Sequence, residues 1–532
     1  MAEMTPETLK RIIQEVYGSE IPDERLRVIS RTVTKTLEAL DKATEVDLGP
    51  RTKFHTLIEQ GTLDPREVRQ GSIKEVSAWI RNGEVSSTEV VKDLIERTRD
   101  VNKKINAYIS VLEKDAVTAA RRADEEIRSG KSRGPLHGIP VSVKDILAVR
   151  GSITSAASKL LAENLTDYDA TSVEHLREAG AIIIGKNNCH EFAYGPTAED
   201  SYYGPCRNPW NPELVTGGSS GGSASAVAAC LCYGSLGTDT GGSGRIHSSY
   251  CGTVGFKPTY GRVSRFGVIP LSWNLDHVSP IARTVEDTAI LLEAIAGKDP
   301  RDSTSSERPV PRYQSGLSND FKRMKVGVLG KYLEECLDQE VRRRVETAVE
   351  VISGLGVSVS EISIPKIEHS APVANMLIAC EATSIHEKWL KERREDYQPS
   401  VRTRLEVGYF YSANHYVKAL RLREWFRREF DRVFKSVDVL LSPTCPILPF
   451  KIGQETINVG GRKTDPRPFI ANFVRIYNLL GLPALSVPCG FSSSGLPIGL
   501  QIAGRPFDEE TVLKLAYAYE QAQPWKDRLP NI

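Results

Sequence analysis

The amino-acid sequence predicts an α/β fold: one large layered domain with a central mixed β-sheet flanked by helices, preceded by an N-terminal helical extension. From about residue 71 onward, short apolar runs typical of buried strands alternate with longer segments of helical periodicity. Residues 1–70 show helical periodicity alone. The 532 residues are 40% hydrophobic, which is enough to bury a large core. We therefore expect an extension at 1–70 and a single domain at 71–532.

The N-terminal extension carries two apolar stripes. Apolar residues recur at helical spacing between Leu9 and Tyr17, and again between Leu26 and Leu40. Two interpretations stay open at this point: a helical pair packed on the main domain, or a dimerisation module. The second interpretation leads us to expect a homodimer.

The main domain begins with clear helix and strand signals. Ser86-Ser87-Thr88-Glu89 is a capping box that opens a helix. A polar, proline-containing stretch near 297–320 is typical of a linker between two halves of the fold. We expect strands at 105–112, 141–143, 181–184, 324–329 and 437–441, and helices at 116–127, 342–355 and from 418 onward.

The most informative stretch runs from Thr216 to Lys257. Two glycine-serine clusters, Gly217–Ser223 and Gly241–Gly244, flank the apolar run Ala224–Cys232, which a flexible linker would not contain. Glycines allow backbone N–H groups to approach a ligand closely. A phosphate-binding loop is disfavoured because neither cluster is followed by Lys-Ser/Thr and no G-x-G-x-x-G occurs.

These clusters resemble the signature of the amidase signature family of serine hydrolases. The family's motifs correspond to Gly217–Ser223, Gly237–Ser243 and Cys251–Thr259, with a further motif at Gly138–Asp145. The motifs occur in the right order and at the right spacing, and the resemblance extends over roughly residues 71–525. It implies an amide hydrolase that works through an acyl-enzyme and uses no cofactor or metal.

The resemblance also implies a role for particular residues. Ser243 is the nucleophile, Lys144 the base, and Ser219, after a cis peptide bond to Gly218, the proton relay between them. A lysine can act as a base only when burial disfavours its charged form. The remaining residues implied at the site are the oxyanion-hole donors Thr240, Gly241, Gly242 and Ser243, the substrate-binding Gly217 and Gly218, and the loop-fixing Ser220, Asp239 and Arg245.

Other interpretations of the same residues stay open. His137, His247 or His277 could serve as the base of a Ser-His-Asp triad, although no G-x-S-x-G elbow is present. Lys144 could instead form a structural ion pair with Asp145. Gly244 and His247 depart from the family pattern, and we expect both to line the acyl pocket.

The leading functional hypothesis is hydrolysis of a small-molecule carboxylic amide. Alternatives are the A subunit of a glutamyl- or aspartyl-tRNA amidotransferase, a hydrolase of urea-like, carbamate or ester substrates, and an inactive binding protein. The N-terminal extension and the C-terminal motifs fit the amidotransferase alternative poorly. A direct assay of ammonia release separates these alternatives.

The amino-acid composition limits the kinds of binding partner that we expect. Lys+Arg 69 against Asp+Glu 68 is a balanced charge, so we expect no nucleic-acid partner. No run of eighteen apolar residues occurs, so we expect no membrane span. The nine cysteines are scattered without a C-x-x-C pair, which favours small buried residues and a cytoplasmic location.

Overall fold

The computed structural model describes residues 63–317, 321–335, 338–459, 461–523 and 528–532. The predicted apolar stripes and the dimerisation module lie outside these residues. The described chain begins just before α3 (Pro65–Gln70), which contacts α5 (Ser87–Ile105). Val68 of α3 is buried in the same hydrophobic core as the rest of the described chain.

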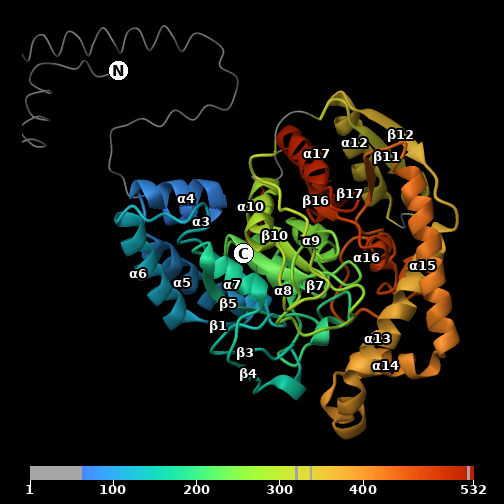
Figure 1. The fold of residues 1–532 in the computed structure, drawn as a ribbon, viewed down its shortest axis with the longest axis horizontal. Coiled ribbons are helices and arrows are strands. Elements are labelled where there is room, and N and C mark those ends of the chain that lie inside the picture. Colours follow the sequence, from blue (N-terminus) through green and yellow to red (C-terminus); the bar gives the residue numbers. More distant parts are fainter. Residues whose placement is uncertain (1–62, 318–320, 336–337, 460, 524–527) are drawn as a thin grey trace, which may run out of the picture. The chain divides into compact units, whose positions relative to one another are not determined.

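A mixed sheet of eleven strands forms the centre of the domain, as predicted (Figure 1). Its strands, in order across the sheet, are β1 (Tyr108–Val111), β5 (Ile182–Asn187), β2 (Pro140–Lys144), β8 (Gly234–Thr238), β10 (Val278–Ala282), β9 (Val254–Lys257), β16 (Ala484–Phe491), β17 (Pro497–Gly504), β13 (Val439–Pro443), β11 (Lys325–Leu329) and β12 (Ser358–Ile362). Three small two-stranded sheets accompany it: β3 (Ser152–Ile153) with β4 (Leu165–Thr166), β6 (Arg207–Asn208) with β7 (Asn211–Val215), and β14 (Ile457–Val459) with β15 (Arg462–Thr464).

Helices flank the sheet, and the long α13 and α15 pack against each other (Figure 1, orange). Besides α3 and α5, the helices are α4 (Ile73–Asn82), α6 (Glu113–Arg128), α7 (Thr171–Glu178), α8 (Gly221–Ala228), α9 (Ile246–Cys251), α10 (Val285–Ile295), α11 (Gly330–Glu334), α12 (Gln339–Gly354), α13 (Ser370–Glu392), α14 (Pro399–Val407), α15 (Ala413–Val433), α16 (Arg475–Leu480) and α17 (Glu509–Ala522). None of the helices in the described part of the chain combines the length and apolar character that crossing a membrane requires.

Most of the predicted elements are confirmed. The Ser86 hydroxyl accepts a hydrogen bond from the Glu89 N–H, and the Glu89 carboxylate accepts one from the Ser86 N–H, so the capping box opens α5. The strand expected at 105–112 is shorter, because α5 continues through Ile105 and ends only where Asn106 adopts a left-handed conformation. The apolar run Ala224–Cys232 begins within a helix, α8.

The predicted linker contains no helix or strand over its described part, residues 297–317. It is nevertheless held in place, because Asp299 accepts hydrogen bonds from the hydroxyls of Ser264, at 2.7 Å, and of Thr171. A buried carboxylate with several donors is a stable anchor for an irregular segment.

The parallel strands β5, β2 and β8 position the candidate site. β2 pairs with β8 in the register Val143↔Leu236, so the ends of both strands lie at the same edge of the sheet. Lys144 is the last residue of β2, and the glycine-rich loop that begins at Asp239 follows β8 directly. The sheet therefore brings two motifs together that lie almost a hundred residues apart in the sequence.

Candidate active site

Lys144 lies at the end of β2 and is completely buried. Its ammonium nitrogen lies 2.7 Å from the hydroxyl oxygen of Ser219 and 2.8 Å from that of Thr238. No carboxylate forms an ion pair with it among the described residues. Burial lowers the pKa of Lys144 to about 8, although Cys189, Asp276 and Asp239 oppose the shift. The side chain is thus closer to a neutral amine than an ordinary lysine is.

The ion pair considered between Lys144 and Asp145 does not form. Asp145 lies 3.0 Å from Lys186 of the neighbouring strand β5 instead. Consecutive residues of an extended segment point to opposite sides, which separates the two side chains. The expectation of an ion pair between Lys144 and Asp145 is therefore wrong.

Ser219 lies just before α8 and follows the cis peptide bond Gly218–Ser219, as the resemblance implied. Its backbone carbonyl accepts a hydrogen bond from the His190 N–H at 2.9 Å. Gly218 is packed so closely that a Cβ there would lie 2.7 Å from the backbone nitrogen of Ala198. Nearby, the Ser220 hydroxyl donates to the Thr238 carbonyl and accepts from the Thr238 N–H, which ties this loop to β8.

The loop after β8 carries Ser243 and is held by a buried ion pair. Asp239 and Arg245, both fully buried, bond through two nitrogens of the guanidinium at 2.9 and 3.1 Å. Although burial by itself would raise the pKa of Asp239, the charge and hydrogen bonds of Arg245 lower it below the usual value. Arg245 also donates to Gln501 at 2.6 Å and to Asn478 at 2.7 Å. The predicted loop-fixing role of this pair is supported by these contacts.

The backbone N–H groups of the loop are not equivalent. The Gly242 N–H donates to the Asp239 carboxylate at 2.8 Å, so it is already used within the loop. Among the described residues, no acceptor bonds the N–H groups of Thr240, Gly241 and Ser243. The hydroxyl of Thr240 donates to Asp276 at 2.5 Å, which holds the start of the loop. Three of the four expected oxyanion donors are thus left unbonded.

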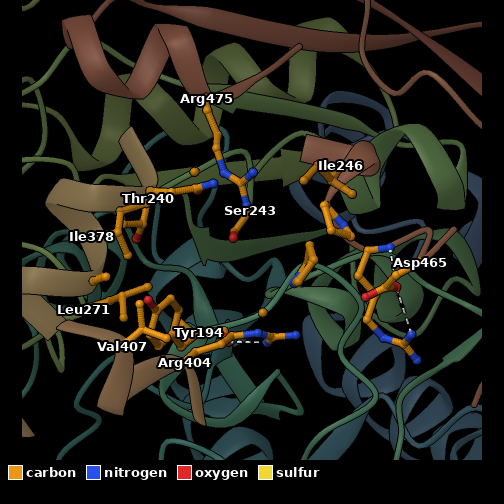
Figure 2. A pocket seen from close by; sticks show the side chains of 18 of the residues that line it. Tyr194, Thr240, Ser243, Ile246, Leu271, Ile378, Arg404, Val407, Asp465 and Arg475 are labelled. Carbon is orange, nitrogen blue, oxygen red and sulfur yellow. Dashed lines mark hydrogen bonds and ion pairs between the residues drawn. The ribbon is translucent and has the colours of Figure 1, made fainter. Parts of the chain in front are cut away.

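Ser243, Thr240 and Gly241 lie on the wall of a cavity of about 300 Å³. Figure 2 shows the Ser243 hydroxyl exposed to this cavity, with Arg475 above it and Arg404 on the facing side. Ser219, Lys144, Gly217 and Gly218 are not among the residues that line the cavity, so the expected substrate-binding role of Gly217 and Gly218 is not supported by its lining. The cavity wall is otherwise mostly apolar near Ser243, with Ile246, Leu271 and Ile378 among its residues.

The histidine alternatives are not supported. His137 lies 3.2 Å from Glu126, and His277 contacts the carbonyls of Asp239 and Leu275. His247 is buried, and its ring nitrogens have no hydrogen-bond partner in the described structure. None of the three forms a hydrogen bond with Ser243.

The expectation that Gly244 and His247 line the acyl pocket is wrong. Neither belongs to the cavity wall. A Cβ at Gly244 would lie 2.2 Å from the Ser279 hydroxyl, so close packing against β10 explains the glycine there. Burial lowers the pKa of His247 to about 3, which keeps its ring neutral.

Sequence reasoning missed Thr238, Asp276 and Arg475 at this site. Arg475 is a lone cation within the otherwise mostly apolar segment 469–482, which is the signal that could have marked it. Thr238 precedes the loop in the signature motif itself. Asp276 carries no local signal, because its contact with Thr240 depends on the fold.

The Amidase family profile matches residues 89–513 of this chain. The chain belongs to the amidase family. The A subunit of glutamyl-tRNA(Gln) amidotransferase from Geobacter metallireducens is 42% identical over 487 residues, which cover 87% of this chain and 99% of that protein. Members of this family, and proteins of similar structure, act on carbon–nitrogen bonds of non-peptide amides. The chain is therefore an amide-hydrolysing enzyme.

Solved structures of the family share the fold. An inhibitor-bound structure of a vestigial protein complex, connected with the origins of an s-triazine catabolic enzyme, superposes with a TM-score of 0.81 at 31% identity, covering 85% of this chain and 99% of that one. The A subunit of glutamyl-tRNA(Gln) amidotransferase from Thermotoga maritima superposes with a TM-score of 0.73 at 35% identity, covering 87% and 96%.

The relatives correct our expectation about partners. We expected a homodimer that acts on a small molecule and has no nucleic-acid partner. Proteins matched over 99% of their length are subunits of an enzyme named for a tRNA, which contradicts that expectation. A balanced net charge excludes only partners attracted by bulk electrostatics, and one chain of a complex can leave tRNA contacts to the others.

Proposed function

We propose that this chain is the amide-hydrolysing subunit of a glutamyl-tRNA(Gln) amidotransferase, which releases ammonia from a carboxamide through an acyl-enzyme on Ser243. The observation that carries the proposal is the 2.7 Å contact between the buried Lys144 nitrogen and Ser219, together with the position of Ser243 on the wall of the cavity. The identity to amidotransferase A subunits over almost their whole length supports the wider role. A cytoplasmic location stays a prediction.

In the proposed reaction, neutral Lys144 accepts the proton of Ser219 while Ser219 accepts that of Ser243. The Ser243 oxygen attacks the amide carbonyl, and the resulting oxyanion is bound by backbone N–H groups. Thr240, Gly241 and Ser243 are the proposed donors, since the Gly242 N–H is bonded to Asp239. The relay then returns a proton to the amide nitrogen as the C–N bond breaks and ammonia leaves. Water repeats the sequence on the acyl-enzyme and yields the free acid.

Two assays on the full-length chain test this proposal. Ser243→Ala should abolish ammonia release. Ser219→Ala should retain a low but measurable activity, because a water molecule can partly replace the proton relay. A serine-directed sulfonyl or phosphonyl reagent should modify the wild type once, on the peptide that contains Ser243. Modification of Ser219 alone would mean that the nucleophile has been misassigned.

A third assay tests the transfer role. The chain, purified with the other subunits of its complex, should convert glutamyl-tRNA(Gln) to glutaminyl-tRNA(Gln) in the presence of an amide donor and ATP, which activates the glutamyl carboxylate by phosphorylation so that ammonia can displace phosphate. Ammonia release without any transfer would favour a free-standing hydrolase, such as the 6-aminohexanoate cyclic dimer hydrolase whose structure superposes with a TM-score of 0.78.

A further inference from the structure

Asp276 is a buried carboxylate that holds the loop carrying Ser243. It lies in the turn segment before β10, and its Oδ1 accepts a hydrogen bond from the Thr240 hydroxyl at 2.5 Å. Its Oδ2 accepts from the backbone N–H groups of Leu271 and Ser272, at 2.9 and 3.0 Å. All three donors are neutral, and no cation within the described residues forms an ion pair with Asp276. The charge of this buried carboxylate is therefore not cancelled by a partner of opposite sign.

The two carboxylates that bond the Ser243 loop differ in this respect. Asp239 is paired with Arg245 at 2.9 Å. Arg265, whose charge acts on Asp276, lies 3.6 Å from another carboxylate, that of Asp302. Burial raises the pKa of Asp276, although its three hydrogen-bond donors oppose the shift. A buried carboxylate without an ion pair is costly, and this one lies beside the reacting groups.

Asp276 and His277 hold two successive residues of the loop. The Asp239 N–H donates to the His277 carbonyl at 2.8 Å, and the Thr240 hydroxyl donates to Asp276. Thr240 and Gly241 then lie on the cavity wall and carry two of the proposed oxyanion donors. Backbone N–H groups stabilise an oxyanion only when they are held in place before the reaction. Asp276 is thus placed to fix the first of these donors.

The same carboxylate holds a second part of the cavity wall. Leu271, whose N–H bonds Asp276, lines the cavity. The next residue, Ser272, donates its hydroxyl to Glu381 of α13 at 2.6 Å. Glu381 is also buried, but among the described residues no hydrogen bond joins it to the Ser243 loop. Two buried carboxylates therefore hold one turn, and only Asp276 extends the contact to the loop.

The charge of Asp276 also acts on the proposed base. Burial lowers the pKa of Lys144, and Asp276 is one of three groups that oppose this shift. The other two are Asp239, which is in an ion pair, and Cys189, whose thiol stays neutral because burial raises its pKa to about 12. His247 is neutral as well, because burial lowers its pKa to about 3. Of the three opposing groups, Asp276 is the one that brings an unpaired charge.

We propose that Asp276 is a positioning residue for the hydrolysis: it holds Thr240 so that the backbone donors face the reacting oxygen, and its charge stabilises the ammonium that Lys144 becomes on accepting a proton. This proposal rests on the proposed amide hydrolysis at Ser243. Thr238, two residues before Thr240, bonds Lys144 at 2.8 Å, so one short segment connects the base with the residue that Asp276 holds. A negative charge also disfavours an oxyanion nearby. The effect on Lys144 therefore shows in the pH dependence, and the effect on the donors in the plateau rate.

The pH dependence of ammonia release tests the charge. In the full-length chain, Asp276→Asn keeps an oxygen acceptor but removes the charge, so the pKa of Lys144 in the kcat/KM profile should fall. We expect a shift of less than about one unit, because the two groups share no hydrogen bond. Glu381→Gln is the matched control: it removes a buried carboxylate from the same turn and should leave that pKa unchanged. A lower plateau with an unmoved pKa in Asp276→Asn would show a purely structural role and overturn the proposal.

A double-mutant cycle tests the positioning of Thr240. Thr240→Val and Asp276→Ala each break the contact, and each should lower kcat about 10- to 100-fold while KM changes less than about threefold, because the oxyanion forms only in the reaction. The double variant should be little slower than either single variant. Thr240→Ser keeps the hydroxyl and should retain most of the rate, which decides the matter even if Asp276→Ala does not fold. Losses that multiply, or equal losses in Thr240→Ser and Thr240→Val, would overturn the proposal.

Modification of Ser243 by a phosphonyl fluoride gives the same comparison without amide turnover. Its rate, followed by mass spectrometry across the pH range, depends on the same base. The pKa of this profile should fall in Asp276→Asn and stay unchanged in Glu381→Gln. If wild type releases no ammonia from any amide, the proposed function fails, while these profiles still decide whether Asp276 acts on the site. Identical profiles for wild type and Asp276→Asn would overturn the proposal.

Discussion

Lys144 and Lys186 are two buried lysines on adjacent parallel strands, and their surroundings give them opposite properties. β2 and β5 pair in the register Val143↔Lys186 and Lys144↔Asn187, so the two lysines occupy adjacent positions and their side chains point to opposite faces of the sheet. Lys186 bonds the Asp145 carboxylate, the Leu147 carbonyl and the Thr154 hydroxyl. Lys144 contacts two hydroxyls and, among the residues that the structure describes, no carboxylate.

The difference lies in the partners and not in the depth of burial. Burial lowers the pKa of both lysines, but at Lys186 the charge of the bound Asp145 acts against the shift. An amine surrounded by hydroxyls can take up and release a proton, since a hydroxyl both donates and accepts. An ammonium bound to a carboxylate is instead a structural cation. Among buried lysines, a candidate base is therefore recognised by the groups that its amine contacts.

Matched methionine substitutions should separate the two lysines most sharply. Lys144→Met should lower kcat about 10²- to 10⁴-fold, because it removes the proposed general base while keeping most of the side-chain volume. We expect its unfolding free energy to change by no more than about 1 kcal/mol, since no carboxylate loses a partner. Steady-state ammonia release and denaturant unfolding measure the two quantities. A rate near that of the wild type would remove Lys144 from the mechanism.

Lys186→Met should have the opposite effect. It leaves Asp145 buried without its cation, which typically costs about 3–5 kcal/mol of stability. The rate per folded molecule should change much less than in Lys144→Met. Denaturant unfolding checks the loss, and Lys186→Met combined with Asp145→Asn should recover part of it. A fully stable single variant would contradict the structural role assigned to Lys186.

The pH dependence should reflect Lys144 in its neutral form. Because the lowered pKa is about 8, the fraction of neutral lysine falls about tenfold for each pH unit below that value. We therefore expect kcat/KM to level off above about pH 9, to be about half of that plateau at pH 8, and to be about 100-fold below the plateau at pH 6. A profile that is flat between pH 6 and pH 8 would show that no group with this pKa acts as the base.

The smallest expected effect concerns Thr238. Its hydroxyl accepts a hydrogen bond from the Lys144 ammonium at 2.8 Å, which favours the charged form. Thr238→Val should therefore lower the pKa seen in the rate profile, by less than about one unit. A shift in the opposite direction would mean that the hydroxyl stabilises the neutral amine.

Much of the site could be predicted from the sequence because the relevant signals are local. The strand that ends at Lys144, the capping box at Ser86 and the glycines around Ser219 and Ser243 each lie within a short segment. The three catalytic candidates could be named from motifs in a fixed order. The N-terminal extension, by contrast, led us toward a homodimer, and the similarity to amidotransferase subunits corrected this expectation.

The sequence by itself determined the family, the α/β class and the residue types at the centre of the site. Only the tertiary structure decided that Asp145 pairs with Lys186, that Asp239 occupies the Gly242 N–H, and that Arg475 faces the cavity without a partner among the described residues. The physical reason is that these properties depend on contacts across the fold. Arg245, for example, bonds Val474 and Gln501, which lie 229 and 256 residues away along the chain. A local pattern shows that a residue is charged or buried, but its ionisation and its freedom to bind a ligand depend on what the fold places beside it.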